Sequence, residues 1–310
     1  MFNLLRGLAV TTLLFSLLLQ ARAADDCLHP TVTVNVVDNQ GQSVAGLDAR
    51  AFHATLNGQS AVISAVRSET VSRIVIVLDV TRSVTGERSW NLARQASEDI
   101  ISSSQITTEL GLVLYAPDFL KTLDFTHSPL EILESIKQMV DRPKRALMGK
   151  AQTALRDAIQ QAVELFGTPK VGDTVYVVSD AGENAGQTGS AALEHLLLER
   201  RVRLFAFIFS MYAFPTSKMP GGFENVAGLT DPTGGDFAGS EGGMVATKPL
   251  QAEVSRLHDQ IFHFYSVELS LPTASDKERK LNVEIVDDHG KKRKDLQTKY
   301  PKKILTCSAK

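Results

Sequence analysis

The 310-residue sequence has little cysteine, no excess of positive charge and no second long apolar run, and each shortage excludes a class of protein. Cys27 and Cys307 are its two cysteines, so the chain can form at most one intramolecular disulfide. Lysine and arginine total 33 against 35 aspartates and glutamates, which gives no general electrostatic footprint for nucleic acid. After the N-terminal segment, no apolar run is long enough to span a membrane.

Several common catalytic motifs are also missing. Gly149-Lys150 is not a phosphate-binding loop, because Lys144 stands where the first glycine belongs and Ala151 where a hydroxyl belongs. Ser240 is not a nucleophile elbow, because Ala238 replaces the glycine that the sharp turn requires. The seven histidines show no metalloprotease spacing. The sequence therefore favours a protein that is not an enzyme.

The N-terminal segment has the pattern of a secretory signal peptide. Arg6 precedes an apolar run over residues 8–19, and Ala21 and Ala23 are the small residues of a cleavage site. The run is too short for a membrane helix, and the residues before Cys27 do not resemble a lipoprotein anchor. We expect cleavage after Ala23 and a secreted or periplasmic mature protein with no membrane span.

Export places both cysteines in a compartment where disulfides persist. A Cys27–Cys307 bridge is therefore expected, and it would hold the two ends of the mature chain side by side. The alternative is two unpaired thiols at the chain ends.

The two ends of the chain share a strand pattern. Hydrophobic and polar residues alternate over residues 32–42, 265–272 and 281–291, and residues 51–66 indicate a hairpin that turns at Asn57-Gly58. These segments predict a small antiparallel β-sandwich built from both termini.

The middle of the chain alternates strands with helices, which predicts an α/β domain with a doubly wound, mostly parallel sheet. The predicted strands cover residues 73–79, 110–116, 173–180 and 202–210, and the predicted helices cover 86–104, 129–140, 153–166, 190–201 and 248–262. Residues 211–244 are rich in glycine and proline and indicate a functional or mobile loop. The predicted organisation is a signal peptide (1–23), N-terminal sandwich strands (24–70), the α/β domain (71–262) and C-terminal sandwich strands (263–310).

Oxygen-bearing side chains follow two of the buried strands. Asp79, Thr81 and Ser83 come at the end of the first, Asp180 ends a later one, and Thr153 begins a helix. Ligands of open α/β sheets bind at the carboxyl ends of the strands, so these side chains are expected to converge there. Hard oxygen donors with few charges suit Mg²⁺ or Mn²⁺.

These residues, in this order and on these elements, resemble the metal-ion-dependent adhesion site of von Willebrand factor A domains. Thr233-Gly234-Gly235 and the flanking strands look similar to a secreted bacterial group related to that family. The resemblance implies that Thr81, Ser83 and Thr153 are hydroxyl ligands of the metal and that Asp79 and Asp180 are its carboxylates. It also implies that a carboxylate from an extracytoplasmic partner protein completes the coordination shell.

Three positions depart from the family pattern. Thr81 replaces the usual serine, Arg82 stands where a small residue is common, and Ala181 stands where glycine usually follows the second aspartate. The alternative without a metal is that Asp79 and Thr81 cap the first helix of the α/β domain.

Two other functions fit parts of the pattern. In a haloacid-dehalogenase-like phosphatase, Asp79 would be the nucleophile and Asp180 a Mg²⁺ ligand, with Lys150 or Lys170 contacting phosphate; Thr81 replaces the second acid that such enzymes need. In a structural envelope scaffold, the α/β domain would bind its partner without any metal. Metal-dependent capture of an acidic protein group is the function that the sequence favours, and the oligomeric state is left open.

Overall fold

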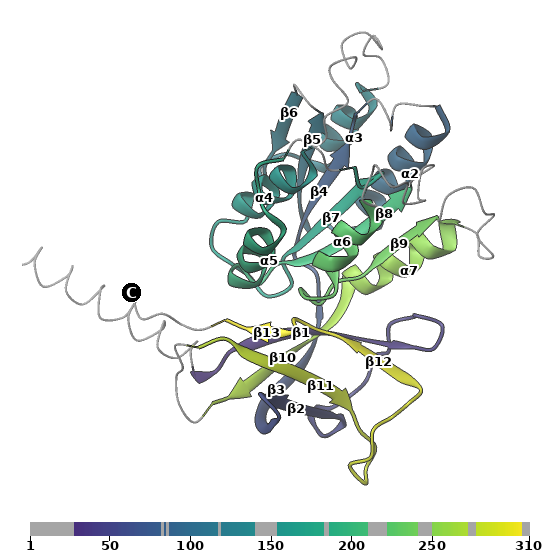
Figure 1. Ribbon diagram of the computed structural model, residues 1–310. Helices are drawn as coiled ribbons and strands as arrows, with labels where there is room; N and C mark the ends of the chain where they lie inside the picture. Colours follow the sequence, from purple (N-terminus) through teal and green to yellow (C-terminus); the bar gives the residue numbers. More distant parts are fainter. Residues whose placement is uncertain are drawn as a thin grey trace, which may run out of the picture.

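The computed structural model describes residues 28–81, 84, 87–116, 119–139, 154–182, 186–209, 222–240, 250–271 and 277–305. The signal segment, both cysteines, Ser83, Arg82, Lys150 and Thr153 lie outside these ranges. Figure 1 shows two parts, an α/β domain above and a curled sheet of strands below. No helix within these ranges has the length and apolarity needed to cross a membrane.

The α/β domain is built on a six-stranded mixed sheet in the order β6-β5-β4-β7-β8-β9 (Figure 1). Four pairings are parallel, and β6 at one edge is antiparallel to β5. The prediction of a mostly parallel sheet was therefore correct except at this edge. The strands are β4 (Arg73–Asp79), β5 (Glu109–Ala116), β6 (Phe119–Leu123), β7 (Thr174–Ser179), β8 (Arg203–Phe209) and β9 (Phe237–Ser240).

Helices cover both faces of this sheet because its central strand is apolar on both sides. All of β4 is buried: Ile74, Ile76 and Leu78 pack with α2, α3 and α7, whereas Val75 and Val77 pack with α4, α5 and α6. The helices are α2 (Glu87–Ser103), α3 (Pro129–Lys137), α4 (Leu155–Leu165), α5 (Ser190–Glu199), α6 (Gly222–Thr230) and α7 (Leu250–Phe262).

The curled sheet takes its strands from both ends of the chain, as predicted, but it is one sheet instead of a sandwich of two. Its order is β12-β1-β10-β3-β2-β11-β13. Thr298 of β12 donates to the Val283 carbonyl of β11 at 2.7 Å, so the sheet curls until nearly opposite ends meet around one core. The strands are β1 (Thr31–Asp38), β2 (Phe52–Leu56), β3 (Gln59–Thr70), β10 (His263–Ser270), β11 (Arg279–Ile285), β12 (Leu296–Lys299) and β13 (Lys303–Ile304), and a short 3-10 turn (Ala49–Ala51) precedes β2.

The Asn57-Gly58 hairpin was predicted correctly. Both residues have positive φ (49° and 80°), which is the conformation that a two-residue turn between twisted strands requires. The interpretation of residues 211–244 as an irregular loop was wrong in part, because helix α6 and strand β9 lie within that segment. Their glycines and prolines masked the periodicity of two short elements.

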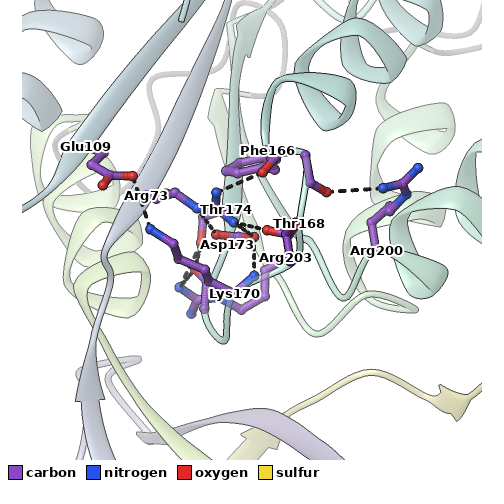
Figure 2. Close-up of polar contacts among 11 residues, drawn as sticks. Arg73, Glu109, Phe166, Thr168, Lys170, Asp173, Thr174, Arg200 and Arg203 are labelled. Atoms are coloured by element: carbon purple, nitrogen blue, oxygen red, sulfur yellow. Dashed lines mark hydrogen bonds and ion pairs between the residues drawn. The ribbon is translucent and has the colours of Figure 1, made fainter. Parts of the chain in front are cut away.

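A buried network of charged groups lies where the α/β domain meets the curled sheet (Figure 2). Arg73 at the start of β4 donates to both carboxylate oxygens of Asp173, and to the Phe166 and Thr168 carbonyls at 2.8 Å. Asp173 precedes β7, so this ion pair joins the N-terminal ends of two neighbouring strands. Burial raises the pKa of Asp173, and Arg73 opposes that rise.

Arg203, at the start of β8, connects the two parts of the molecule. Its guanidinium donates to Thr174 Oγ1 at 2.8 Å, to the Ile261 carbonyl at 2.9 Å and to Asn35 Oδ1 of β1 at 3.3 Å. Burial lowers its pKa to about 9, yet it remains a cation at neutral pH. The ring of Phe264 lies 4.2 Å from the guanidinium carbon.

Asn35 completes the end of α7. Its amide donates to the Gln260 carbonyl at 2.6 Å and to the His263 carbonyl at 2.7 Å. Helix α7 runs straight into β10, so its last carbonyls have no further turn of helix to pair with, and side chains of β1 and β8 satisfy them instead.

Thr233-Gly234-Gly235 forms a second contact between the two parts. Thr233 forms an isolated bridge with Pro301, and the Lys302 amide donates to the Pro232 carbonyl at 2.9 Å. A Cβ on Gly235 would stand 1.8 Å from the Leu204 carbonyl oxygen, so only glycine fits beside β8.

Gly235→Ala is expected to lower the free energy of unfolding by about 1–3 kcal/mol, because β8 must shift to admit the methyl group. Gly228→Ala is the matched control: a Cβ there meets nothing within 4 Å, and alanine in helix α6 adds roughly 0.5–1 kcal/mol of stability. Urea unfolding of the wild type and both variants checks this. Equal stability of the two variants would contradict the close approach of Gly235 to β8.

Candidate metal site at the carboxyl edge of the mixed sheet

Two carboxylates lie at the carboxyl ends of neighbouring parallel strands. Asp79 is the last residue of β4, and Asp180 follows directly after β7. Leu78 is opposite Val178 in the parallel ladder, so the two aspartates leave the sheet at the same edge. This is the edge at which open α/β sheets bind ligands.

Asp79 is fully buried and accepts hydrogen bonds from Thr81, Tyr115 and Ser179. Its Oδ1 accepts the Thr81 amide at 2.8 Å, and its Oδ2 accepts the Ser179 hydroxyl at 2.7 Å and the Tyr115 hydroxyl at 3.1 Å. The hydroxyls of Tyr115 and Ser179 also lie 2.9 Å apart. These hydrogen bonds therefore hold the carboxylate in one orientation.

The charge of Asp79 is poorly compensated. Burial, and then the nearby charge of Asp180, raise the pKa of Asp79 to about 7, although hydrogen bonds from Thr81 and Ser179 oppose the rise. Burial also raises the pKa of Tyr115 well above its usual value, so the phenol remains a donor. None of the ion pairs within the described ranges involves Asp79 or Asp180. A cation at this edge would relieve the repulsion between the two carboxylates.

The turn after β7 has the shape that glycine usually provides. Ala181 has φ 61°, in the left-handed region, and is fully buried. Its amide donates to the Ser179 hydroxyl at 2.9 Å, and the Gly182 amide donates to Asp180 Oδ1 at 3.0 Å. Alanine thus keeps the backbone conformation expected of the family's glycine, at a cost of about 1–2 kcal/mol.

The structure brings together three of the five predicted ligands. Asp79 and Asp180 leave the sheet at the same edge, and Thr81, whose amide donates to Asp79, is 4% exposed. Ser83 and Thr153 lie outside the described residues, as does Arg82. Helix α4 begins at Leu155, so the chain returns to the α/β domain close after Thr153.

The residues present fit a hard divalent cation. Two carboxylates and a threonine hydroxyl are the oxygen donors that Mg²⁺ and Mn²⁺ prefer, and their uncompensated charge favours a cation over a neutral ligand. No group of three or more histidine, cysteine, aspartate or glutamate residues capable of holding a metal occurs in the described parts of the chain. The predicted set of ligands contains only two carboxylates, and hydroxyl groups supply its other oxygen donors.

Among the described residues, Asp79 does not cap helix α2. Helix α2 begins at Glu87, several residues after Thr81. Within the described residues, Asp79 accepts hydrogen bonds from Thr81, Ser179 and Tyr115, and none of these belongs to α2. Asp79 therefore links the end of β4 to β5 through Tyr115 and to β7 through Ser179.

Sequence reasoning missed Tyr115 and Ser179. Ser179 immediately precedes Asp180, and a hydroxyl beside a candidate ligand was a usable signal. Tyr115 is opposite Asp79 in the β4–β5 ladder. That juxtaposition depends on strand register, which the sequence of a single strand does not contain.

Comparison with known families identifies the domain that carries this site. Residues 74–183 match the von Willebrand factor type A domain, which confirms the resemblance drawn from Asp79, Thr81 and Asp180. The match spans β4 to the turn after β7 and so includes both carboxylates. This part of the chain is therefore similar to a von Willebrand factor type A domain, and its α/β fold agrees with the match.

Solved structures give weaker likenesses. The protein BatB from Bacteroides thetaiotaomicron is 14% identical with a TM-score of 0.43, over 61% of this chain and 98% of that one. An aerotolerance-related membrane protein from Bacteroides fragilis is 13% identical with a TM-score of 0.46, over the same shares. Proximal thread matrix protein 1 from the mussel byssus is 16% identical with a TM-score of 0.46, over 64% of this chain and 48% of that one.

Likenesses this weak do not carry the identification, which rests on the family match. The sequence matches no curated protein.

Asp79→Asn is expected to stabilise the metal-free protein above pH 7. The folded-state pKa of about 7 lies above the ordinary value of 3.8, so the wild type loses stability as pH rises from about 4 to about 7 and the carboxyl ionises in its buried position. The loss amounts to at most roughly 4 kcal/mol, and asparagine, which cannot ionise, avoids it.

Urea unfolding in EDTA at pH 5 and pH 8 measures this difference. Asp231→Asn, at an exposed carboxylate, is the control and should follow the wild type. If the free energy of unfolding changed equally with pH in the wild type and in Asp79→Asn, ionisation of Asp79 would not destabilise the folded protein.

Proposed function

We propose that this chain is an exported, non-enzymatic protein-binding module that holds Mg²⁺ or Mn²⁺ at the carboxyl edge of its mixed sheet and captures a carboxylate of a partner protein. The observation that carries the proposal is the buried charge of Asp79 beside Asp180, which no ion pair among the described residues compensates. The family match supports an interaction module of the adhesion type.

Each residue has a defined part in this proposal. Asp79 and Asp180 supply negative charge, and Thr81, with Ser83 and Thr153, supplies hydroxyl oxygens. Tyr115 and Ser179 hold the Asp79 carboxylate in one orientation. When bound, the cation would offer a coordination position to an acidic group from outside the chain.

The partner in this proposal is an extracytoplasmic protein. Removal of residues 1–23 on export would leave a mature chain that begins at Ala24 and acts in the periplasm or outside the cell. A partner carboxylate adds charge to a site that already contains two carboxylates, so its capture requires the metal. Chelation should therefore abolish binding instead of weakening it slightly.

Millimolar Mg²⁺ or Mn²⁺ is expected to raise the thermal midpoint of the mature protein by several degrees relative to EDTA. At a hundredfold excess over the dissociation constant, binding adds about 2.7 kcal/mol, and each kcal/mol moves the midpoint of a domain this size by roughly 2–4 °C. Asp180→Asn should abolish the rise. Glu98→Gln, a carboxylate paired with Arg94 on α2, should retain it.

A second arm with acetate present supplies a small carboxylate in place of the partner's. A rise that needs both metal and acetate would still support the site. No rise in either arm, or an equal rise in Asp180→Asn, would replace the proposal with a metal-free scaffold.

We also propose that Cys27 and Cys307 form a disulfide after export. Both lie outside the described residues, but the nearby Pro30 and Leu305 line one cavity, and the Leu271 amide donates to the Leu28 carbonyl at 2.8 Å. The described parts of the two chain ends thus lie close together. A bridge there would constrain the unfolded chain more than the folded one.

Reduction of the oxidised mature protein is expected to cost about 2–4 kcal/mol of stability. Unfolding with and without reductant measures the change, and intact mass under non-reducing conditions should be lower by two hydrogens. The double variant Cys27→Ser, Cys307→Ser should not respond to reductant. Two alkylatable thiols in the exported wild type would contradict the bridge.

A further inference from the structure

A cavity of about 140 Å³ lies between the α/β domain and the curled sheet, at the opposite ends of the strands from Asp79. Its walls are mostly apolar and come from both parts. They include Val32, Val171, Leu198, Val202 and Ile304. An apolar cavity of about 150 Å³ accommodates benzene, so this one has room for a single aliphatic side chain.

Positive charge surrounds the apolar walls. Arg201, Lys277, Arg279 and Lys303 line the cavity, against one carboxylate, that of Glu199. Lys303 is already paired with two carboxylates, Glu278 at 3.2 Å and Glu194 at 3.6 Å. No ion pair in the described parts of the chain involves Arg201. The charge of the lining therefore favours an anionic group on the ligand.

Arg201 has a left-handed backbone conformation, which glycine adopts at lower cost, so its side chain does not favour this fold. Arg201 follows helix α5 with φ 54°, and the bonds Val202 N to Leu197 O (2.9 Å) and Arg201 N to Leu198 O (3.1 Å) form the turn that usually ends a helix with glycine. An arginine in this left-handed position costs roughly 1–2 kcal/mol. The guanidinium at the cavity is exposed and forms no ion pair with the described residues.

Among the described strands, none pairs with the second edge of residues 31–34 of β1, beside the same cavity. Residues 31–34 pair with β10 on one side, whereas β12 pairs with residues 35–38 on the other. The Pro30 carbonyl accepts the Leu269 amide of β10, so alternation along the strand points the backbone groups of Thr31 and Thr33 away from β10. Both residues line the cavity. This edge offers hydrogen bonds to an extended backbone.

We propose that this cavity binds the C-terminal residue of an extended peptide from another protein. The apolar terminal side chain enters the cavity between Leu198 and Val202, and the terminal carboxylate pairs with the Arg201 guanidinium. The peptide backbone lies along Thr31 and Thr33. Apolar burial, charge-assisted pairing and strand addition are the three features by which proteins recognise peptide C-termini.

This site is separate from the proposed metal site and does not depend on it. Strand β8 begins at Arg203, directly after Val202 of the cavity lining, and ends at Phe209 near the other edge, roughly 20 Å away at the usual rise per residue. Chelation of divalent metal should leave peptide binding at the cavity unchanged.

Fluorescence anisotropy with the mature protein tests the proposal. The probes are N-terminally labelled five-residue peptides of extended sequence that end in leucine, either as the free acid or as the C-terminal amide, with a free acid that ends in lysine as a third. The leucine free acid should bind saturably in EDTA, at least tenfold more tightly than either of the others. Equal binding of acid and amide, or no saturable binding of any peptide, would overturn the proposal.

Arg201→Gly separates binding from folding. Glycine suits the left-handed position, so the variant should unfold at the same midpoint as the wild type or higher, while affinity for the leucine free acid falls at least tenfold. Val171→Trp, at a 40% exposed position on the cavity wall, should block binding by filling the space. Lys294→Ala, at an exposed lysine outside the cavity lining, should bind as the wild type does.

The chain's own terminal residues are the competing occupant. Binding that appears only after deletion of residues 306–310, and not in the intact mature protein, would assign the cavity to the chain itself and overturn the proposal. Undiminished affinity in Arg201→Gly would do the same.

Discussion

The buried guanidinium of Arg203 is the contact that sets the two parts of the molecule in place. It joins the start of β8 to β1 of the curled sheet and to the last turn of α7, from a position that is 1% exposed. A buried cation is costly to the fold, and no described carboxylate contacts this one. Carbonyl, hydroxyl and aromatic neighbours offset part of the cost, although Nε of Arg203 has no hydrogen-bond partner among the described residues. Because these neighbours come from both parts, neither part alone provides its environment.

Charged side chains at the two ends of the mixed sheet differ in how their charge is compensated. At the N-terminal ends of the strands, Arg73 pairs with Asp173 and Arg203 donates to carbonyl and hydroxyl oxygens, so these charges join neighbouring elements. At the carboxyl ends, Asp79 and Asp180 repel one another with no cation from the described chain. An excess of charge that the fold does not compensate is expected where a ligand supplies the compensation. The contrast supports a binding role for that edge.

Much of this architecture was predictable because its signals are local. The apolar run of β4, the Asn57-Gly58 turn and the carboxylates at strand ends each follow from a short stretch of sequence. Tyr115 and Ser179 around Asp79 depend on which strands pair and in what register, and Arg203 depends on how two parts meet. The curl of the antiparallel sheet is a property of all its strands together. Helix α6 and strand β9 escaped notice because glycine and proline hid their short patterns.

The way the chain passes between its two parts has a mechanical consequence. It crosses twice, from β3 to β4 and from α7 to β10, and Thr70 and His263 at these crossings are paired neighbours in one antiparallel ladder. Tension on the carboxyl edge of the α/β domain would therefore pull β3 and β10 in the same direction, without sliding one past the other. Two adjacent tethers of this kind act as a hinge. Arg203 on one side and the Thr233–Pro301 contact on the other are the braces that resist its bending.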